Sequence, residues 1–248
     1  MNDNKHKRSV ILLVDDDPDI IEIVGYILGQ EGYRVVFATN GVDAVEQAKK
    51  EVPDLIVMDL MMPRMDGMEA VSAIRKLPKL NHTMITFLSA AQEDFLQVAA
   101  YNAGADDYIT KPIRPKLLVS RIKAMLRRQY MPAEVGISYE SIAGFHVFPE
   151  EYRLLRDGRN ISLTKKEFEL FCLFASKPGK VFKRVDILNK LWSTEVVGKR
   201  TIDVHVLKLR EKIGEEYFTS ITGIGYKFDL PLSGDTLSKK GSSPKSEG

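Results

Sequence analysis

Residues Leu55–Pro63, which read Leu-Ile-Val-Met-Asp-Leu-Met-Met-Pro, decide the fold of this chain. The apolar run up to Met58 is typical of a buried strand, and it ends at Asp59 shortly before a proline. In open parallel α/β sheets, functional residues collect at the carboxyl ends of the strands. Asp59 is therefore the first candidate for a functional side chain.

Strand and helix patterns alternate through the first 128 residues. Strands are expected at 10–14, 33–38, 55–59, 84–88 and 107–110, with helices at 18–30, 41–50, 66–77, 94–102 and 114–128. Five such βα units predict an α/β domain over residues 9–128, built on a doubly wound parallel sheet.

The rest of the chain has a different pattern. Residues 129–136 lack periodicity and are expected to be a linker, and the Ser-, Gly- and Lys-rich residues 231–248 to be a disordered tail. Between them, residues 137–163 alternate as short antiparallel strands, and Thr164 opens a helix with a capping box. Further helices at 184–192 and 198–213, followed by a hairpin around Gly223, predict an α+β winged helix-turn-helix over residues 137–230.

The composition is that of a soluble globular protein. The 248 residues are 44% hydrophobic and carry a net charge of +2. No apolar run approaches the roughly 18 residues of a membrane span, and the start resembles no export signal, so no membrane association is expected. The single cysteine, Cys172, suits a buried packing role in a reducing, cytoplasmic setting.

Acidic residues and one lysine fall at the ends of several expected strands. Asp15 and Asp16 follow the first strand, Ser89 the fourth and Lys111 the fifth. Oxygen ligands of this kind suit Mg²⁺, with Asp15, Asp16, Asp59 and the backbone carbonyl of Met61 as the expected metal ligands. Lys111 and Ser89 are placed to meet a phosphoryl group on Asp59. Helix capping explains Asp17, and it would also explain Asp15 and Asp16 if they stood by themselves. It does not explain why polar side chains follow four separate strands.

These motifs, with residues 104–108 (Gly-Ala-Asp-Asp-Tyr), make residues 9–128 similar to a response-regulator receiver domain. Residues 137–230 resemble the winged-helix effector of the OmpR/PhoB type. The resemblance implies that Asp59 accepts a phosphoryl group from a sensor histidine kinase and that Ser89 and Tyr108 are the switch pair. In this reading the phosphate draws Ser89 inward and the Tyr108 ring turns in behind it.

The resemblance also implies a homodimer formed on phosphorylation. Its expected charge pairs are Asp106 with Lys123 and Asp107 with Arg121, each occurring twice across a two-fold axis. A further ionic pair of the family is replaced here by Gln97 and Leu117, which weakens the expected dimer by at most about 1 kcal/mol.

Helix 198–213 is the expected DNA-reading element. Its core face is Ile202, Val206, Leu209 and Ile213, and the window carries five basic and two acidic residues. Expected contacts with double-stranded promoter DNA are Arg200, Thr201, Val204, His205, Leu207, Lys208, Arg210, Lys212 and, on the wing, Lys227. For His205, a packing or phosphate-binding role is as plausible as base reading. Thr222 stands where family members often carry a minor-groove arginine, so this chain departs from the family pattern at the wing.

The leading hypothesis is a two-component transcription regulator and not an enzyme. RNA polymerase is expected to contact helix 184–192 and the following loop, by analogy with the family. A phosphatase with an Asp nucleophile would need a second Asp where this chain has Met61. A DNA-binding regulator that works without phosphorylation is the remaining alternative.

Overall fold

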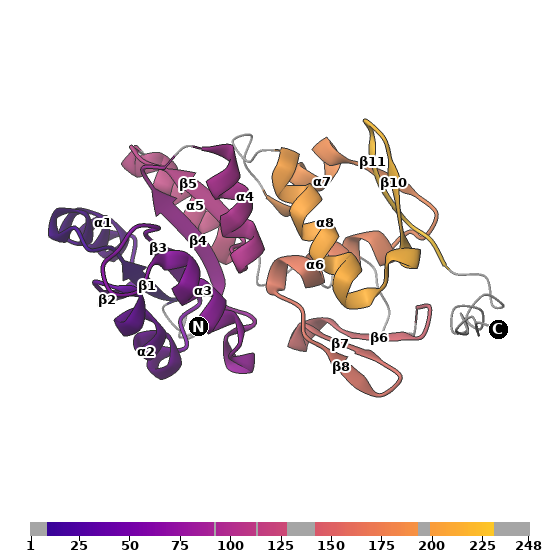
Figure 1. Ribbon diagram of the computed structural model, residues 1–248, viewed down its shortest axis with the longest axis horizontal. Coiled ribbons are helices and arrows are strands. Elements are labelled where there is room, and N and C mark those ends of the chain that lie inside the picture. Colours follow the sequence, from indigo (N-terminus) through magenta and orange to yellow (C-terminus); the bar gives the residue numbers. More distant parts are fainter. Residues whose placement is uncertain (1–8, 92, 113, 128–141, 193–198, 231–248) are drawn as a thin grey trace, which may run out of the picture.

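The structure is a computed structural model that describes residues 9–91, 93–112, 114–127, 142–192 and 199–230. The expected linker 129–136 and tail 231–248 lie outside the described residues. Two groups of elements, each with its own sheets and core, occupy the two halves of the molecule (Figure 1).

The N-terminal half is built on one five-stranded parallel sheet in the order β2-β1-β3-β4-β5. Its strands are β1 (Val10–Val14), β2 (Arg34–Ala38), β3 (Leu55–Met58), β4 (Met84–Ser89) and β5 (Asp107–Thr110). Its helices are α1 (Pro18–Gln30), α2 (Gly41–Glu51), α3 (Gly67–Arg75), the short η1 (Pro78–Leu80), α4 (Asp94–Ala103) and α5 (Pro115–Arg127). The doubly wound α/β fold predicted from the sequence is confirmed.

The two faces of this sheet bury alternate residues of each strand. Ile11 and Leu13 pack with residues of α1 and α5, whereas Leu12 and Val14 pack with residues of α2, α3 and α4. Because side chains in a strand alternate with a period of two, a strand buried on both faces has to be apolar throughout. The start of α1 is fixed by its local sequence. Asp17 caps this helix by accepting a hydrogen bond from the Asp19 amide, as predicted.

The C-terminal half contains two three-stranded antiparallel sheets around three helices. The first sheet joins β6 (Phe145–Phe148), β7 (Arg153–Arg156) and β8 (Arg159–Ile161), with η3 (Pro149–Glu151) after β6. The helices are α6 (Lys165–Ala175), α7 (Arg184–Leu191), α8 (Lys199–Ile213) and the short η4 (Glu215–Tyr217). The second sheet has the order β10-β11-β9, with β9 (Val181–Lys183), β10 (Phe218–Ile221) and β11 (Gly225–Phe228).

The winged helix-turn-helix follows from local sequence and from one aromatic core. Thr164 and Glu167 form the predicted capping box at the start of α6. The predicted core face of α8 is buried, with Ile202 and Leu209 fully inaccessible. The sequence did not reveal β9, whose three residues pair with β11 and extend the hairpin into a three-stranded wing sheet.

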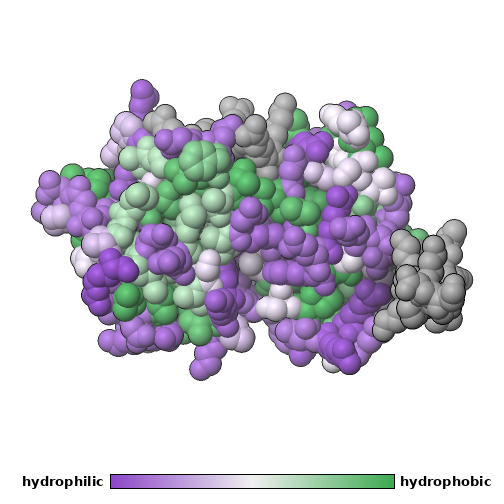
Figure 2. Space-filling model, in the orientation of Figure 1, coloured by the Kyte–Doolittle hydropathy of each residue, from purple (hydrophilic) through white to green (hydrophobic). Residues whose placement is uncertain are grey.

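The two halves differ in the surface that they present. On the face drawn in Figure 2, hydrophobic side chains gather over the N-terminal half, and the C-terminal half is largely hydrophilic. Within the described ranges, no helix is long and apolar enough to cross a bilayer.

Candidate functional site

Parallel pairing of β1 and β3 brings Asp15 and Asp59 to the same sheet edge. Val14 is in register with Met58, and the Asp59 amide donates to the Val14 carbonyl oxygen at 2.8 Å. Both carboxylates are almost completely buried, with relative exposures of 2% and 7%. Two buried acids this close require a cationic partner, because burial of an unpaired carboxylate is strongly unfavourable.

Lys111 supplies that cation. Its Nζ donates to Asp15 Oδ2 at 2.7 Å and to Asp59 Oδ1 at 2.8 Å. Burial alone would lower the pKa of Lys111, but the two hydrogen bonds to these carboxylates raise it above its usual value. Burial raises the pKa of Asp15, and the hydrogen bond from Lys111 only partly opposes this effect. The ammonium group therefore remains charged and holds both acids together.

The geometry fits a divalent cation with two protein carboxylates. Asp15 and Asp59 already converge on one positively charged atom, and Mg²⁺ commonly uses one or two carboxylates together with waters and substrate oxygens. Asp16 is exposed and does not join them, and no group of three or more acidic, His or Cys side chains converges within the described residues. Met61 lies at the rim, where its amide donates to Asp59 Oδ2 at 2.7 Å.

Ser89 and Tyr108 are placed beside the pocket. Ser89 is buried at the end of β4, and its Oγ accepts a hydrogen bond from the Ala91 amide at 3.3 Å. The Tyr108 hydroxyl donates to the Ala91 carbonyl at 2.8 Å, and its ring is only 6% exposed. This differs from the sequence-based expectation that the ring turns inward only after phosphate binds, because here the Ala91 carbonyl already holds the hydroxyl. The Lys111–Pro112 peptide bond is cis.

The expected DNA-reading face of α8 is packed against the N-terminal half. Thr201, Val204 and His205 have exposures of only 2%, 9% and 2%, and Val204 joins the hydrophobic cluster of the first sheet. The Tyr101 ring of α4 lies 5.8 Å from the His205 ring, and its hydroxyl is hydrogen-bonded to Thr201. In this conformation these three residues contact protein, so DNA cannot reach them.

The basic residues expected at DNA also have protein partners. Lys208 Nζ donates to the Asn102 carbonyl of α4 at 2.7 Å. Arg210 donates to the Phe218 carbonyl and to Ser220 Oγ on β10. Lys212 pairs with Glu167 at 2.5 Å, and Lys227 pairs with Asp229 at 2.8 Å. Leu207 is 49% exposed. The side chain of Arg200 lies outside the described residues.

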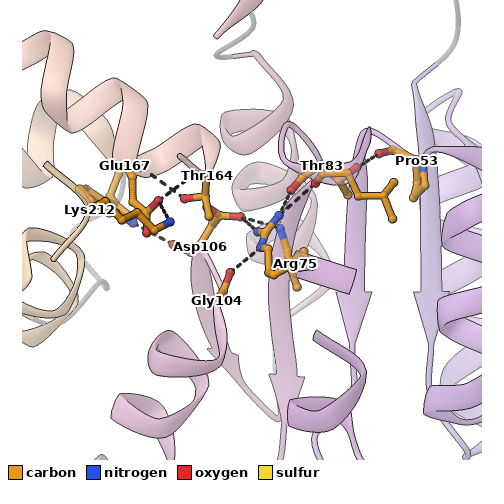
Figure 3. Close-up of polar contacts among 11 residues, drawn as sticks. Pro53, Arg75, Thr83, Gly104, Asp106, Thr164, Glu167 and Lys212 are labelled. Atoms are coloured by element: carbon orange, nitrogen blue, oxygen red, sulfur yellow. Dashed lines mark hydrogen bonds and ion pairs between the residues drawn. The ribbon is translucent and has the colours of Figure 1, made fainter. Parts of the chain in front are cut away.

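The predicted dimer pair of Asp106 with Lys123 is not available on this surface. Asp106 is fully buried, and its Oδ2 accepts hydrogen bonds from Arg75 at 2.6 Å and from the Ile85 amide at 2.8 Å (Figure 3). Lys123 instead pairs with Glu31, the residue that follows α1, at 2.5 Å. The sequence could not show this, because the nearest cation to Asp106 comes from α3, 31 positions away.

Part of the predicted dimer face does remain open. Asp107 and Arg121 are buried and lie 3.7 Å apart within one chain, so their expected pairing across a dimer is already satisfied internally. Gln97 and Leu117 line an open cavity of about 400 Å³ between α4 and α5, together with Tyr108 and Arg121. Leu117 is 39% exposed.

Two important residues had no clear signal in the sequence. Arg75 donates to the carbonyls of Gly104, Leu80 and Thr83 as well as to Asp106. Trp192, the only tryptophan in the chain, donates its Nε1–H to the Asp106 carbonyl at 3.1 Å and so links the two halves. Its uniqueness was the only hint, since hydrogen bonds between segments 86 positions apart have no local pattern.

Comparison with known proteins identifies the family. Residues 11–123 match the family model described as "Response regulator receiver domain", and residues 158–228 match "Transcriptional regulatory protein, C terminal". The chain is 35% identical over 234 residues to the alkaline phosphatase synthesis transcriptional regulatory protein PhoP of Bacillus subtilis (strain 168). That match covers 89% of this chain and 97% of the relative. This chain belongs to the OmpR/PhoB-type response regulators.

One solved structure supports the fold over most of the chain, and a second is similar to this chain in sequence. A RitR mutant is 22% identical and superposes with a TM-score of 0.74, covering 89% of this response regulator and 99% of that chain. DrrB, a Thermotoga maritima OmpR/PhoB homologue, is 29% identical over 90% of the chain and 99% of its own, with a TM-score of 0.49. By its two family matches and its PhoP relative, the protein is a phosphorylatable transcription regulator with an N-terminal receiver and a C-terminal effector, and its family implies a sensor kinase and promoter DNA as partners.

Proposed function

We propose that Asp59 is the phosphoacceptor of this response regulator. The observation that carries this role is the convergence of Asp15, Asp59 and Lys111 at one sheet edge. A carboxylate oxygen of Asp59 attacks the phosphorus of a kinase phosphohistidine, the P–N bond breaks, and the imidazole leaves with its electron pair and takes up a proton. An acyl phosphate remains on Asp59, and Lys111 pairs with one of its oxygens.

Mg²⁺ would neutralise the charge that accumulates in this transfer. Asp15 and Asp59 are the proposed carboxylate ligands, with Asp16 at the rim and the Met61 carbonyl as further oxygen donors. Ser89 is the proposed hydroxyl donor to the phosphate. Because the Ser89 hydroxyl also accepts from the Ala91 amide, its movement toward phosphate would release the loop that holds the Tyr108 hydroxyl.

The effector is proposed to bind promoter DNA through α8 and the wing. The structure describes a conformation in which Thr201, Val204 and His205 face the receiver. Binding in the major groove therefore requires α8 to leave α4. Phosphorylation of Asp59 would favour the separated form by altering the position of α4, on which α8 rests.

Homodimerisation and contact with RNA polymerase complete the proposal. The open cavity beside Gln97 and Leu117 leaves an apolar part of the receiver face for a second copy. Helix α7 is the proposed contact with RNA polymerase, and most of the loop after it, residues 193–198, lies outside the described residues. A shared receiver dimer would raise the affinity for paired DNA half-sites through effective concentration.

Intact mass and light scattering test these roles together. Wild type, Asp59→Ala and Asp16→Asn are each incubated with Mg²⁺ and acetyl phosphate. Asp16→Asn removes the exposed carboxylate at the rim of the pocket. One added phosphoryl group and a shift to dimer in wild type alone would support the proposal. Phosphate gain without dimerisation would argue against the dimer. No phosphate gain, together with DNA binding by the unmodified chain, would favour a regulator that works without phosphorylation.

A further inference from the structure

His205 occupies the centre of the contact between the receiver and effector. Its ring lies between two aromatic rings, 5.8 Å from Tyr101 of α4 and 5.3 Å from Trp192 at the end of α7. The side chain is 2% exposed. Neither ring nitrogen makes a hydrogen bond of normal geometry among the described residues, and only the Asp106 backbone carbonyl favours a proton on the ring. An imidazole in this setting is buried as a neutral group, since little compensates a charge on it.

The charged residues around His205 also favour the neutral form of its imidazole. The pKa of His205 is lowered to about 3, mainly by burial and in smaller part by the cations Lys208, Lys166 and Arg75. Only the Asp106 carbonyl acts in the opposite direction, and that oxygen already accepts the Trp192 Nε1–H. Once α8 separates from the receiver, the imidazole regains water and an ordinary pKa near 6.5.

We propose that protonation of His205 opens the contact between α8 and the receiver, so that acidification frees the DNA-reading helix without phosphorylation. Closed chains exclude the proton and open chains bind it, so each proton taken up shifts the population toward the open form. The acid response would be a second input to the regulator beside Asp59. It does not depend on the proposed phosphoryl chemistry.

The sign and size of the effect follow from the two pKa values. The pKa is lower in the closed form, so the closed form keeps its full stability above pH 6.5 and loses it as pH falls toward about 3. Between pH 7.5 and pH 5.5, the ratio of open to closed chains should rise about tenfold. One proton per opening event limits the slope to about a factor of ten per pH unit.

Other ionisable groups near the ring do not predict the same response. The pKa of Tyr101 is raised by burial, so its phenol is neutral throughout this pH range. Asp106 and Arg75 pair within the receiver, and both remain paired when the effector leaves. Lys166 pairs with Glu169 inside the effector at 2.8 Å.

A second histidine lies at the edge of the same interface. His82 of the receiver has its ring 5.5 Å from the Tyr152 ring of the effector. Its pKa is lowered by partial burial and by Lys165. His82 remains much more exposed than His205, so its share of the acid response should be smaller.

The indole N–H of Trp192 reports opening directly, because it donates across the interface and the chain has no other tryptophan. Its hydrogen-exchange rate is measured by NMR on the full-length chain. The exchange rate of free tryptophan indole at the same pH, divided by this rate, gives a protection factor. The background variant is Asp59→Ala, without Mg²⁺ or phosphodonor. The comparison variants are His205→Phe, His205→Gln and His82→Gln.

The expected result is a tenfold fall in indole protection from pH 7.5 to pH 5.5 in the background protein and in His82→Gln. Protection in either His205 variant should change with pH only by the smaller share of His82, even if its absolute value is lower. Amide exchange in β3 serves as the control for global unfolding and should not follow the indole. A pH-independent background protein, or His205 variants with the same slope as the background, would overturn the proposal.

Discussion

Arg75→Met should be among the most destabilising substitutions in the receiver. The Arg75 side chain is 10% exposed, and its removal leaves the fully buried Asp106 carboxylate without a cation (Figure 3). It also leaves the carbonyls of Gly104 and Thr83 without their donor. Loss of one partner of a buried pair typically costs about 3–5 kcal/mol, so the free energy of unfolding should fall by about that amount at pH 7.5.

The loss should depend on pH with a definite sign. Burial raises the pKa of Asp106 even with Arg75 present, and without the guanidinium the pKa should rise further. An acid with a raised folded-state pKa stabilises the fold when protonated and loses that contribution as pH rises through this pKa. Arg75→Met should therefore cost less at pH 5 than at pH 7.5, relative to wild type at each pH.

Urea unfolding of four proteins provides the assay. The set is wild type, Arg75→Met, Asp106→Asn and the double variant, each at both pH values. The double variant should recover at least 1 kcal/mol relative to Arg75→Met, because the buried charge is gone and an Asn oxygen can still accept from the Ile85 amide. A single-variant cost below 1 kcal/mol, or no recovery in the double variant, would refute this reasoning.

Three further substitutions address the pocket and the interface. Lys111→Met should lower the free energy of unfolding by about 1–3 kcal/mol, because two converging carboxylates lose the cation that they share. Millimolar Mg²⁺ should restore part of this free energy in thermal melts. Gly67→Ala should destabilise the fold by about 1–3 kcal/mol and slow phosphorylation, because a Cβ there would lie 2.1 Å from the Asp59 carbonyl oxygen. The control is Gly29→Ala, which has open space around it and should be neutral or stabilising when measured by calorimetry. Trp192→Phe removes one buried hydrogen bond between the domains and should raise the fraction of open chains about 5- to 100-fold. The rate of chemical cross-linking between the two domains measures this fraction, and an unchanged rate would contradict the interface described above.

The sequence by itself determined most elements of the fold and the meeting of Asp15 and Asp59 at one sheet edge. Apolar runs of strand length, interrupted by helix caps, were enough to place β1, β3 and β4. Because parallel strands end at one sheet edge, acids that follow separate strands must meet there, and Asp15 and Asp59 do. The core face of α8 was equally readable, since a 3.6-residue period separates buried from outward positions.

Tertiary structure alone decided which partners cover the outward positions. By period, Val204 lies on the outward face of α8 and His205 near its flank, yet both are buried, because α4 of another domain packs there. Asp106 carries a charge of the kind usually found on the surface, yet its carboxylate is buried and pairs with Arg75. A local sequence pattern shows which residues share a face, but long-range packing determines whether water, DNA or a second domain lies against it.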